Sequence, residues 1–242
     1  MDKQKFNIAV LIDGDNAQPK LLQVILEEVS KYGKATIRRI YGDWTTPQMN
    51  GWKEAINQHS FSPVQKFSYT TGKNSTDSSL IIDAMDILHS KNTDGFCIVS
   101  SDSDYTGLAK RIREEGVFMM GIGEKKTPNA FIQSCEIFTY SENIAPQTEK
   151  KNIKDVDKKP AKKVAPSSID TSFIDRAFDI SINEEEEVFI SHVGLNLRKI
   201  NPSFDPRAYG FKTLTQLFEN LPKYKVIKNE RNGLNHPLVK RK

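Results

Sequence analysis

The sequence contains few of the residues that hold zinc-binding or disulfide-rich proteins together. Its 242 residues include two cysteines, Cys97 and Cys135, and four histidines. These six side chains never cluster at the spacing of zinc ligands, which argues against the common zinc folds. Two cysteines in a chain of this length cannot form a disulfide scaffold, so we expect a reducing compartment.

Long apolar segments are also missing. No run approaches the roughly 20 residues that a membrane-spanning helix needs. The first residues, Met1 to Phe6, have no apolar core of the kind found in a secretory signal. We therefore expect a cytoplasmic protein with no membrane partner. The length suffices for one large domain and one small domain.

Short apolar runs alternate with helical patterns between residues 6 and 140. The expected strands are 6–12, 35–41, 63–67, 95–100, 117–122 and 136–140. The expected helices are 17–31, 47–58, 77–90, 104–115 and about 128–133. Strict alternation of strand and helix implies an α/β domain, here residues 1–145, with a parallel sheet and helices on both faces.

A second, smaller domain is expected at residues 169–242. Between the two domains, residues 146–168 are rich in lysine and proline and contain no aromatic residue, which predicts a flexible basic linker. Helices are expected at 170–180, after Asn183 and at about 213–220. In the middle helix, Glu184 to Glu187 would occupy the first turn.

The end of this second domain carries a hairpin signal. Asn232 and Gly233 lie between two strand-like runs, Tyr224 to Lys228 and Leu234 to Val239. Asn-Gly is the strongest short signal for a two-residue hairpin turn. Three helices and a hairpin predict a small α+β winged helix-turn-helix domain.

Acidic residues follow two of the expected strands. Ile8 to Ile12 leads into Asp13-Gly14-Asp15-Asn16, and Phe96 to Val99 leads into Ser100-Ser101-Asp102-Ser103-Asp104. Asp77 stands at the start of a helix between them. Carboxyl ends of parallel strands share one crevice, so these acids should converge. A pair of charges about 4 Å apart repels by roughly 4 kcal/mol at an effective dielectric near 20.

Converging carboxylates are tolerated when a cation lies among them. Oxygen ligands favour Mg²⁺ or Mn²⁺. The pattern therefore predicts a metal-dependent phosphodiester hydrolase in which Asp13, Asp77, Asp102 and Asp104 are catalytic and bind the metal. Such ions lower the pKa of water and offset phosphate charge, so no serine, cysteine or histidine nucleophile is needed.

Each of these acids also has an ordinary structural explanation. Asp13 and Asn16 fit an Asx-turn that leads into a helix. Ser101, Asp102 and Asp77 are all residue types that cap helices. Five consecutive polar residues from Ser100 to Asp104 exceed what a cap requires, which favours a site. Asp83 is rotated roughly 120° from Asp77 around a helix, so we expect it to be supporting or structural.

Basic residues near the strand ends suit a polyanionic substrate. Lys73 lies in the loop before Asp77, and Lys125 follows the fifth strand. Either could contact a phosphate or be plain solvated surface. The net charge of +4 is mildly basic, and lysines gather in the linker and at Lys240-Arg241-Lys242. That distribution fits a polyanionic substrate, although a solvated surface explains the composition equally well.

Other readings of the acidic motif stay open. A haloacid-dehalogenase-type phosphatase would also place Asp13-x-Asp15 after its first strand. That chemistry requires Thr or Val two residues after the second Asp, where this chain has Ala17. A non-catalytic RNA-binding adaptor is the main alternative, and DNA is a further possible substrate.

Residues 5–143 resemble the NYN domain, a LabA-like branch of the PIN-like nucleases. The resemblance rests on Ile12 to Asn16, on Lys73 to Asp77 with Asp83, and on Ser100 to Tyr105. It implies a metal-dependent ribonuclease with Asp13, Asp77, Asp102 and Asp104 as the acidic set. Asn16 and Ser101 would be polar helpers.

Residues 169–242 resemble the OST-HTH, or LOTUS, domain. The matching segment is Tyr209 to Phe218, followed by the hairpin. The resemblance implies binding of single-stranded or structured RNA and, in some cases, of a protein partner. Lys212 and the neighbouring lysines and arginines would contact phosphates. The acidic run Glu184 to Glu187 should face away from RNA or bind a protein. The sequence leaves the oligomeric state open.

Overall fold

The computed structural model describes residues 6–67, 75–146, 171–182, 186–231 and 234–242. Lys73, the turn Asn232-Gly233 and all of the expected linker except Pro146 lie outside these ranges. The chain divides into two units, Met1–Gln147 and Thr148–Lys242. No described helix has both the length and the apolar character needed to cross a membrane.

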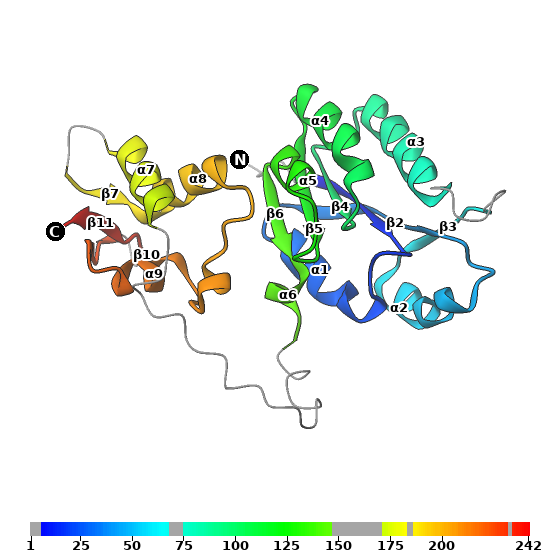
Figure 1. Cartoon of the computed structure of the whole chain (residues 1–242), viewed down its shortest axis with the longest axis horizontal. Coiled ribbons are helices and arrows are strands. Elements are labelled where there is room, and N and C mark those ends of the chain that lie inside the picture. The colour runs from blue at the N-terminus through cyan, green and yellow to red at the C-terminus, as the bar shows by residue number, and fades with distance from the viewer. Residues whose placement is uncertain (1–5, 68–74, 147–170, 183–185, 232–233) are drawn as a thin grey trace. The chain divides into compact units, whose positions relative to one another are not determined.

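The first unit is built on a six-stranded parallel sheet (Figure 1). The strands run in the order β3-β2-β1-β4-β5-β6. Their bounds are β1 Asn7–Asp13, β2 Lys34–Gly42, β3 Ser62–Gln65, β4 Gly95–Val99, β5 Phe118–Gly123 and β6 Ile137–Tyr140. The expected parallel α/β architecture is confirmed, and each expected strand is present within a few residues of its predicted ends.

Helices cover both faces of this sheet (Figure 1). They are α1 Leu22–Ser30, α2 Trp52–His59, α3 Ser75–Ser90, α4 Thr106–Glu114, α5 Asn129–Ser134 and α6 Ser141–Ile144. Short 3-10 segments at Pro19–Leu21, Pro47–Gly51 and Ser103–Tyr105 precede α1, α2 and α4. Alternate residues of β1 serve two cores: Ala9 and Leu11 pack on the α3, α4 and α5 side, and Ile8, Val10 and Ile12 on the α1 and α2 side.

Strand order brings the predicted acidic loops together. β1 is central and pairs in parallel with both β2 and β4. Ile12 lies opposite Val99, so the loops that follow β1 and β4 leave the sheet side by side. This is where the direction of strand order reverses, the usual ligand position in open parallel sheets. The fold therefore delivers the Asp13 and Asp102 segments to one edge.

The second unit has three main helices around its own apolar core. They are α7 Ser172–Ser181, α8 Ile190–Ile200 and α9 Leu214–Asn220, with a 3-10 segment at Pro206–Tyr209. A three-stranded sheet has the order β7-β11-β8. Its strands are β7 Val188–Phe189, β11 Leu238–Arg241 and β8 Tyr224–Ile227, and a short pair, β9 Glu230–Arg231 and β10 Leu234–Asn235, extends the hairpin.

The predicted start of the middle helix of the second unit is wrong. Asn183 and Glu184 lie outside the described residues, and α8 begins at Ile190 rather than directly after them. Val188 and Phe189 instead form an antiparallel pair with Leu238 and Val239. Their backbone hydrogen bonds with β11 replace a helical turn, and an aromatic and a β-branched residue suit that role. Val193 and Leu197 are buried as the helical stripe predicts.

Candidate functional site

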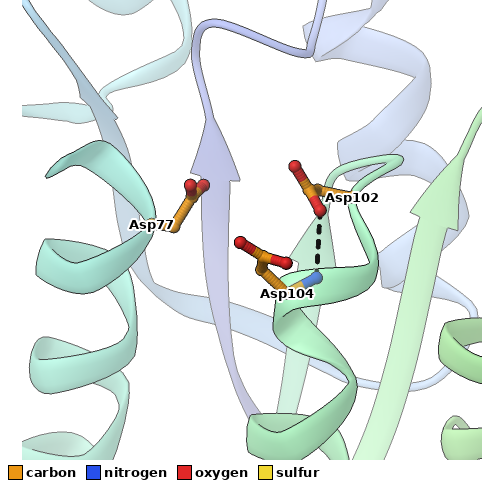
Figure 2. A group of neighbouring side chains, drawn as sticks. All are labelled: Asp77, Asp102 and Asp104. Carbon is orange, nitrogen blue, oxygen red and sulfur yellow. Dashed lines mark hydrogen bonds between the residues drawn. The ribbon is translucent and has the colours of Figure 1, made fainter. Parts of the chain in front are cut away.

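Three of the predicted acids meet at the carboxyl edge of the sheet. Asp77, Asp102 and Asp104 each place a carboxylate oxygen within 4.8 Å of the others (Figure 2). Asp77 comes from the first turn of α3, which begins two residues earlier than expected, at Ser75. Asp102 and Asp104 come from the loop and short 3-10 turn after β4. Segments distant in sequence thus converge on one point.

Asp102 also performs the structural role that the sequence offered as an alternative. Its Oδ1 accepts a hydrogen bond from the backbone N–H of Asp104 at 3.0 Å, which caps the short turn (Figure 2). The cap holds the Asp102 carboxylate against the backbone of the turn that carries Asp104. Capping engages one oxygen, and a carboxylate has a second oxygen that can serve as a metal ligand.

Asp13 is buried, with 1% of its surface exposed. Its Oδ2 accepts hydrogen bonds from Asn16 Nδ2 at 2.7 Å and Ser100 Oγ at 3.0 Å. Its Oδ1 accepts from the backbone N–H of Asp15 at 3.2 Å, so the Asx-turn is also present. Asn16 is therefore placed to orient Asp13. Asp13 is not among the three acids whose oxygens meet.

Tyr105 joins Asp13 to the cluster, and sequence reasoning gave it no role. Its fully buried hydroxyl lies 2.6 Å from Asp77 Oδ1 and 3.3 Å from Asp13 Oδ2. A phenol carries a single proton, so the shorter contact identifies Asp77 as its main acceptor. The sequence feature that could have indicated this role is the position of Tyr105 directly after the Ser-Ser-Asp-Ser-Asp run. A tyrosine there is equally typical of an ordinary core residue.

Ser100 and Thr76 are two further supports that the sequence did not single out. Ser100 Oγ donates to Asp13 and accepts from the backbone N–H of Asp102 at 3.1 Å. Thr76 Oγ1 donates to Asp15 Oδ2 at 2.9 Å. Ser101, by contrast, accepts from the backbone N–H of Glu124 at 2.9 Å and so braces the loop after β5. The hydroxyl that contacts Asp13 is thus that of Ser100, one residue before the expected helper.

Two acids at this site, Asp77 and Asp13, have a raised pKa. Burial raises the pKa of Asp77, and the neighbouring carboxylates of Asp102, Asp104 and Asp15 raise it further, against a lowering contribution from Tyr105. Burial also raises the pKa of Asp13, opposed by the hydrogen bond from Asn16. Burial raises the pKa of the Tyr105 hydroxyl, so Tyr105 stays protonated and acts as a donor.

The donor set of the cluster fits a hard divalent cation. It offers carboxylate oxygens from three residues, without nitrogen or sulfur ligands. Within the described residues, neither Asp77 nor Asp102 forms an ion pair with a lysine or arginine. Oxygen-only sites of this kind suit Mg²⁺ or Mn²⁺. Asp77, Asp102 and Asp104 are the residues that could hold it.

The predicted basic contacts are only partly placed. Lys73 lies outside the described residues. Lys125 is exposed in the loop after β5, where its backbone N–H donates to Glu142 at 2.9 Å. Lys212 is exposed in the second unit, just before α9. Asp83 pairs with Arg39 and accepts from the Tyr41 hydroxyl, which gives it a structural role between α3 and β2.

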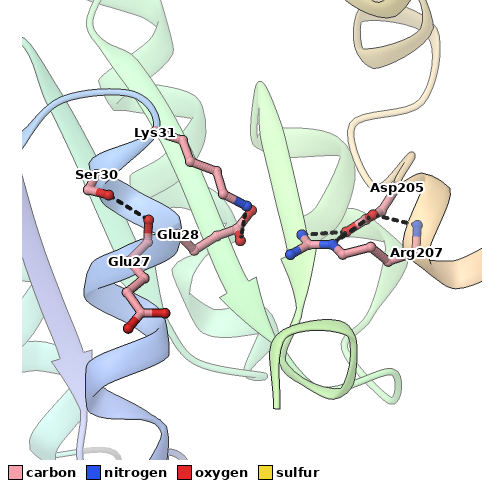
Figure 3. A network of polar contacts seen from close by, with 6 residues as sticks. All are labelled: Glu27, Glu28, Ser30, Lys31, Asp205 and Arg207. Atoms are coloured by element: carbon pink, nitrogen blue, oxygen red, sulfur yellow. Dashed lines mark hydrogen bonds and ion pairs between the residues drawn. The ribbon is translucent and has the colours of Figure 1, made fainter. Parts of the chain in front are cut away.

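Some charged residues outside the cluster are engaged within their own unit (Figure 3). In the first unit, Lys31 Nζ lies 2.6 Å from Glu28 Oε2 on α1. In the second unit, Arg207 Nη2 lies 2.6 Å from Asp205 Oδ2, and Asp205 also caps the 3-10 turn that contains Arg207. Arg207, expected as a phosphate contact, is thus held by an acid of its own loop.

Comparison with known proteins assigns both parts of the chain to domain families. The NYN domain family matches residues 7–142, and the OST-HTH/LOTUS domain family matches residues 165–236. A crystal structure of a protein of unknown function from Vibrio parahaemolyticus RIMD 2210633 shares the fold, with a TM-score of 0.50 and 17% sequence identity. The similarity covers 58% of this chain and 95% of that one. No curated protein matches the chain.

Both resemblances expected from the sequence are confirmed. The NYN match spans the sheet and the converging acids, and the OST-HTH/LOTUS match spans most of the second unit. The two kinds of domain indicate a nuclease-like protein with an RNA-binding domain. The chain belongs to the NYN domain family of PIN-like proteins and carries an OST-HTH/LOTUS domain after its NYN domain.

Proposed function

We propose that this protein is a divalent-metal-dependent ribonuclease that hydrolyses RNA phosphodiester bonds. The observation that carries the proposal is the convergence of Asp77, Asp102 and Asp104, which repel one another unless a cation lies among them. Asp77, Asp102 and Asp104 would hold Mg²⁺ or Mn²⁺. Such a cation supplies a lowered pKa for water and charge compensation for phosphate oxygens.

The residues around the cluster set its shape. Tyr105 donates to Asp77 and so fixes the direction of that carboxylate. Asp13 is held by Asn16 and Ser100, and when ionised it would add negative charge that favours a cation at the cluster. Asp104, the exposed member of the cluster, would accept a proton from an attacking water.

The second unit would hold the RNA. Lys212, Lys225 and Lys228 are exposed there and suit phosphate contacts. A domain tethered to the nuclease raises the local substrate concentration, often to the millimolar range for short flexible linkers. A protein partner for this unit and a cytoplasmic location are further parts of the proposal.

Cleavage of labelled RNA by the purified full chain tests the proposal. We expect cleavage in Mg²⁺ or Mn²⁺, none in EDTA, and a loss of at least about 100-fold in Asp102→Asn, because a metal ligand is removed. Asp86→Asn is the matched control, since Asp86 is an exposed acid on α3 outside the cluster. If wild type were no more active than Asp102→Asn, the nuclease proposal would be contradicted and an RNA-binding adaptor would be favoured.

A further inference from the structure

A groove lies on the first unit beside the ends of β2 and β3. Its volume is about 470 Å³, within the range of small-molecule sites. Trp44, Met49, Ile56 and Pro63 give it apolar walls, and Asn50, Lys53 and Asn57 add polar groups. The groove thus offers flat apolar surface beside amide and ammonium groups.

The indole of Trp44 is held in place. Its Nε1 donates to the backbone carbonyl of Val64 at 3.0 Å, and its backbone N–H donates to Gln65 Oε1 at 3.0 Å. Gln65 Nε2 in turn donates to Asp43 Oδ1 at 2.9 Å. Trp44 keeps part of its surface exposed, whereas the other tryptophan, Trp52, is 1% exposed. A fixed and partly exposed indole can stack on a flat ligand at small entropic cost.

Three polar side chains in the groove are available to a ligand. Asn50, Lys53 and Asn57 are exposed. None of them makes a side-chain hydrogen bond or ion pair within the described part of the chain. An amide offers both donors and an acceptor, which suits a base edge, and an ammonium suits phosphate.

Met49 connects the groove to the acidic cluster. It lines the groove, and its Cε lies 2.7 Å from the position that a Cβ on Gly14 would occupy. Gly14 stands between Asp13 and Asp15, and Asp15 accepts from Thr76, the neighbour of Asp77. A series of contacts therefore links the groove, through Met49, to the loop after β1 that carries Asp13 and Asp15.

We propose that this groove binds a single base of the RNA strand whose backbone passes the acidic cluster. Trp44 stacks on the base, Asn57 and Asn50 contact its edge, and Lys53 contacts a flanking phosphate. The inference rests on the proposed function, since it assigns to the groove another nucleotide of the strand that is cut.

A comparison of two probes tests the base site. Each is a 5′-fluorescein-labelled 12-nucleotide strand, one of mixed-sequence RNA and one in which every base is replaced by an abasic residue. Fluorescence anisotropy gives their Kd for the full chain in Ca²⁺, with strand integrity checked on a gel. Trp44→Leu should weaken binding of RNA by about tenfold and leave the abasic strand unchanged, because only a base can stack on the indole. Trp44→Phe, which keeps an aromatic face, should lose less.

Surface variants keep the test independent of folding. Asn57→Ala should weaken binding of RNA by a few fold and leave the abasic strand unchanged, and Lys53→Ala should weaken both strands. Lys34→Ala is the matched control, since Lys34 is exposed at the opposite end of β2, and it should alter neither Kd.

The outcomes separate this inference from the nuclease proposal. Equal effects of Trp44→Leu and Asn57→Ala on both strands, or on neither, overturn the base site even when wild type cuts RNA in Mg²⁺. Selective loss of RNA binding by these variants supports the base site even when no cleavage is seen.

Discussion

At the scale of single residues, the site is organised by one hydroxyl as much as by its acids. Tyr105 is buried and donates its one proton mainly to Asp77 at 2.6 Å, with Asp13 Oδ2 at 3.3 Å from the same hydroxyl. Sequence reasoning found the acids because charged residues after apolar strands are conspicuous. It missed Tyr105 and Ser100 because a tyrosine or serine looks the same in the sequence whether it only packs in the core or also orients a carboxylate.

Removal of the Tyr105 hydroxyl should impair the site without unfolding the protein. In Tyr105→Phe, Asp77 loses its donor, and we expect a 10- to 100-fold loss of metal affinity or activity, the usual range for groups that orient a metal ligand. A titration of cleavage rate against Mg²⁺ would show a higher half-saturating concentration. An unchanged Mg²⁺ dependence would contradict the role assigned to Tyr105.

The raised pKa of Asp77 predicts that this acid lowers the stability of the metal-free protein at neutral pH. A carboxyl whose pKa is raised by folding stabilises the protein at pH values below its ordinary pKa of about 4, and this contribution is lost as the pH rises through the raised value. In metal-free buffer, Asp77→Asn should therefore be more stable than wild type at pH 7 and melt at a higher temperature. The difference should shrink toward pH 4.

Thermal melts of both proteins at several pH values check this. Mg²⁺ should raise the melting temperature of wild type at pH 7 and not that of Asp77→Asn, because a bound ligand stabilises only the state that binds it. A wild type that melts higher than Asp77→Asn in the absence of metal would show that the acids do not repel one another.

At the scale of elements, the strand and helix pattern was largely predictable. Apolar runs such as Phe96 to Val99 end in polar residues, and the chain alternates strongly enough that all six strands of the first unit could be predicted. The failure at Val188 and Phe189 has a physical cause. Their side chains fit a helical stripe, but their backbone pairs with β11, about 50 residues later, and no local pattern carries that information.

Tight packing at the end of β5 supports the loop that carries the acids. A Cβ on Gly123 would lie 2.5 Å from the carbonyl oxygen of Ser100 and 2.7 Å from Thr127 Oγ1. Gly123→Ala should therefore cost about 1–3 kcal/mol of stability and lower activity, because Ser100 holds Asp13. Urea unfolding and cleavage assays measure the two effects.

Gly107→Ala is the control for this substitution. A Cβ on Gly107 meets nothing within 4 Å, and the residue lies in α4. Alanine there should stabilise the protein by about 0.5–1 kcal/mol through helix propensity and leave activity unchanged. Equal effects of the two substitutions would show that β5 packing does not position the acids.

At the scale of the whole molecule, each unit has its own core and a separate predicted task. The first unit carries the acidic cluster, and the second carries exposed lysines on a winged-helix scaffold. The division into two parts could be predicted from the sequence because residues 146–168 interrupt the apolar periodicity. Which RNA the two units would bind depends on surface chemistry, which periodicity does not encode.

Truncation after residue 147 should separate capture from chemistry. The first unit alone keeps its sheet, its core and its acids, so we expect kcat within a few fold of the full chain. KM for RNA should rise by about 100-fold or more, because tethering no longer concentrates the substrate. An unchanged KM would show that the second unit does not hold the substrate.

Location of a metal ion tests the central claim most directly. Crystals of the full chain soaked in Mn²⁺ should give an anomalous difference peak between the carboxylates of Asp77, Asp102 and Asp104, and Asp77→Asn crystals treated in the same way should lose it. If wild-type crystals show the three carboxylates with no peak among them at millimolar Mn²⁺, these acids do not form a metal centre and the proposed nuclease mechanism is contradicted.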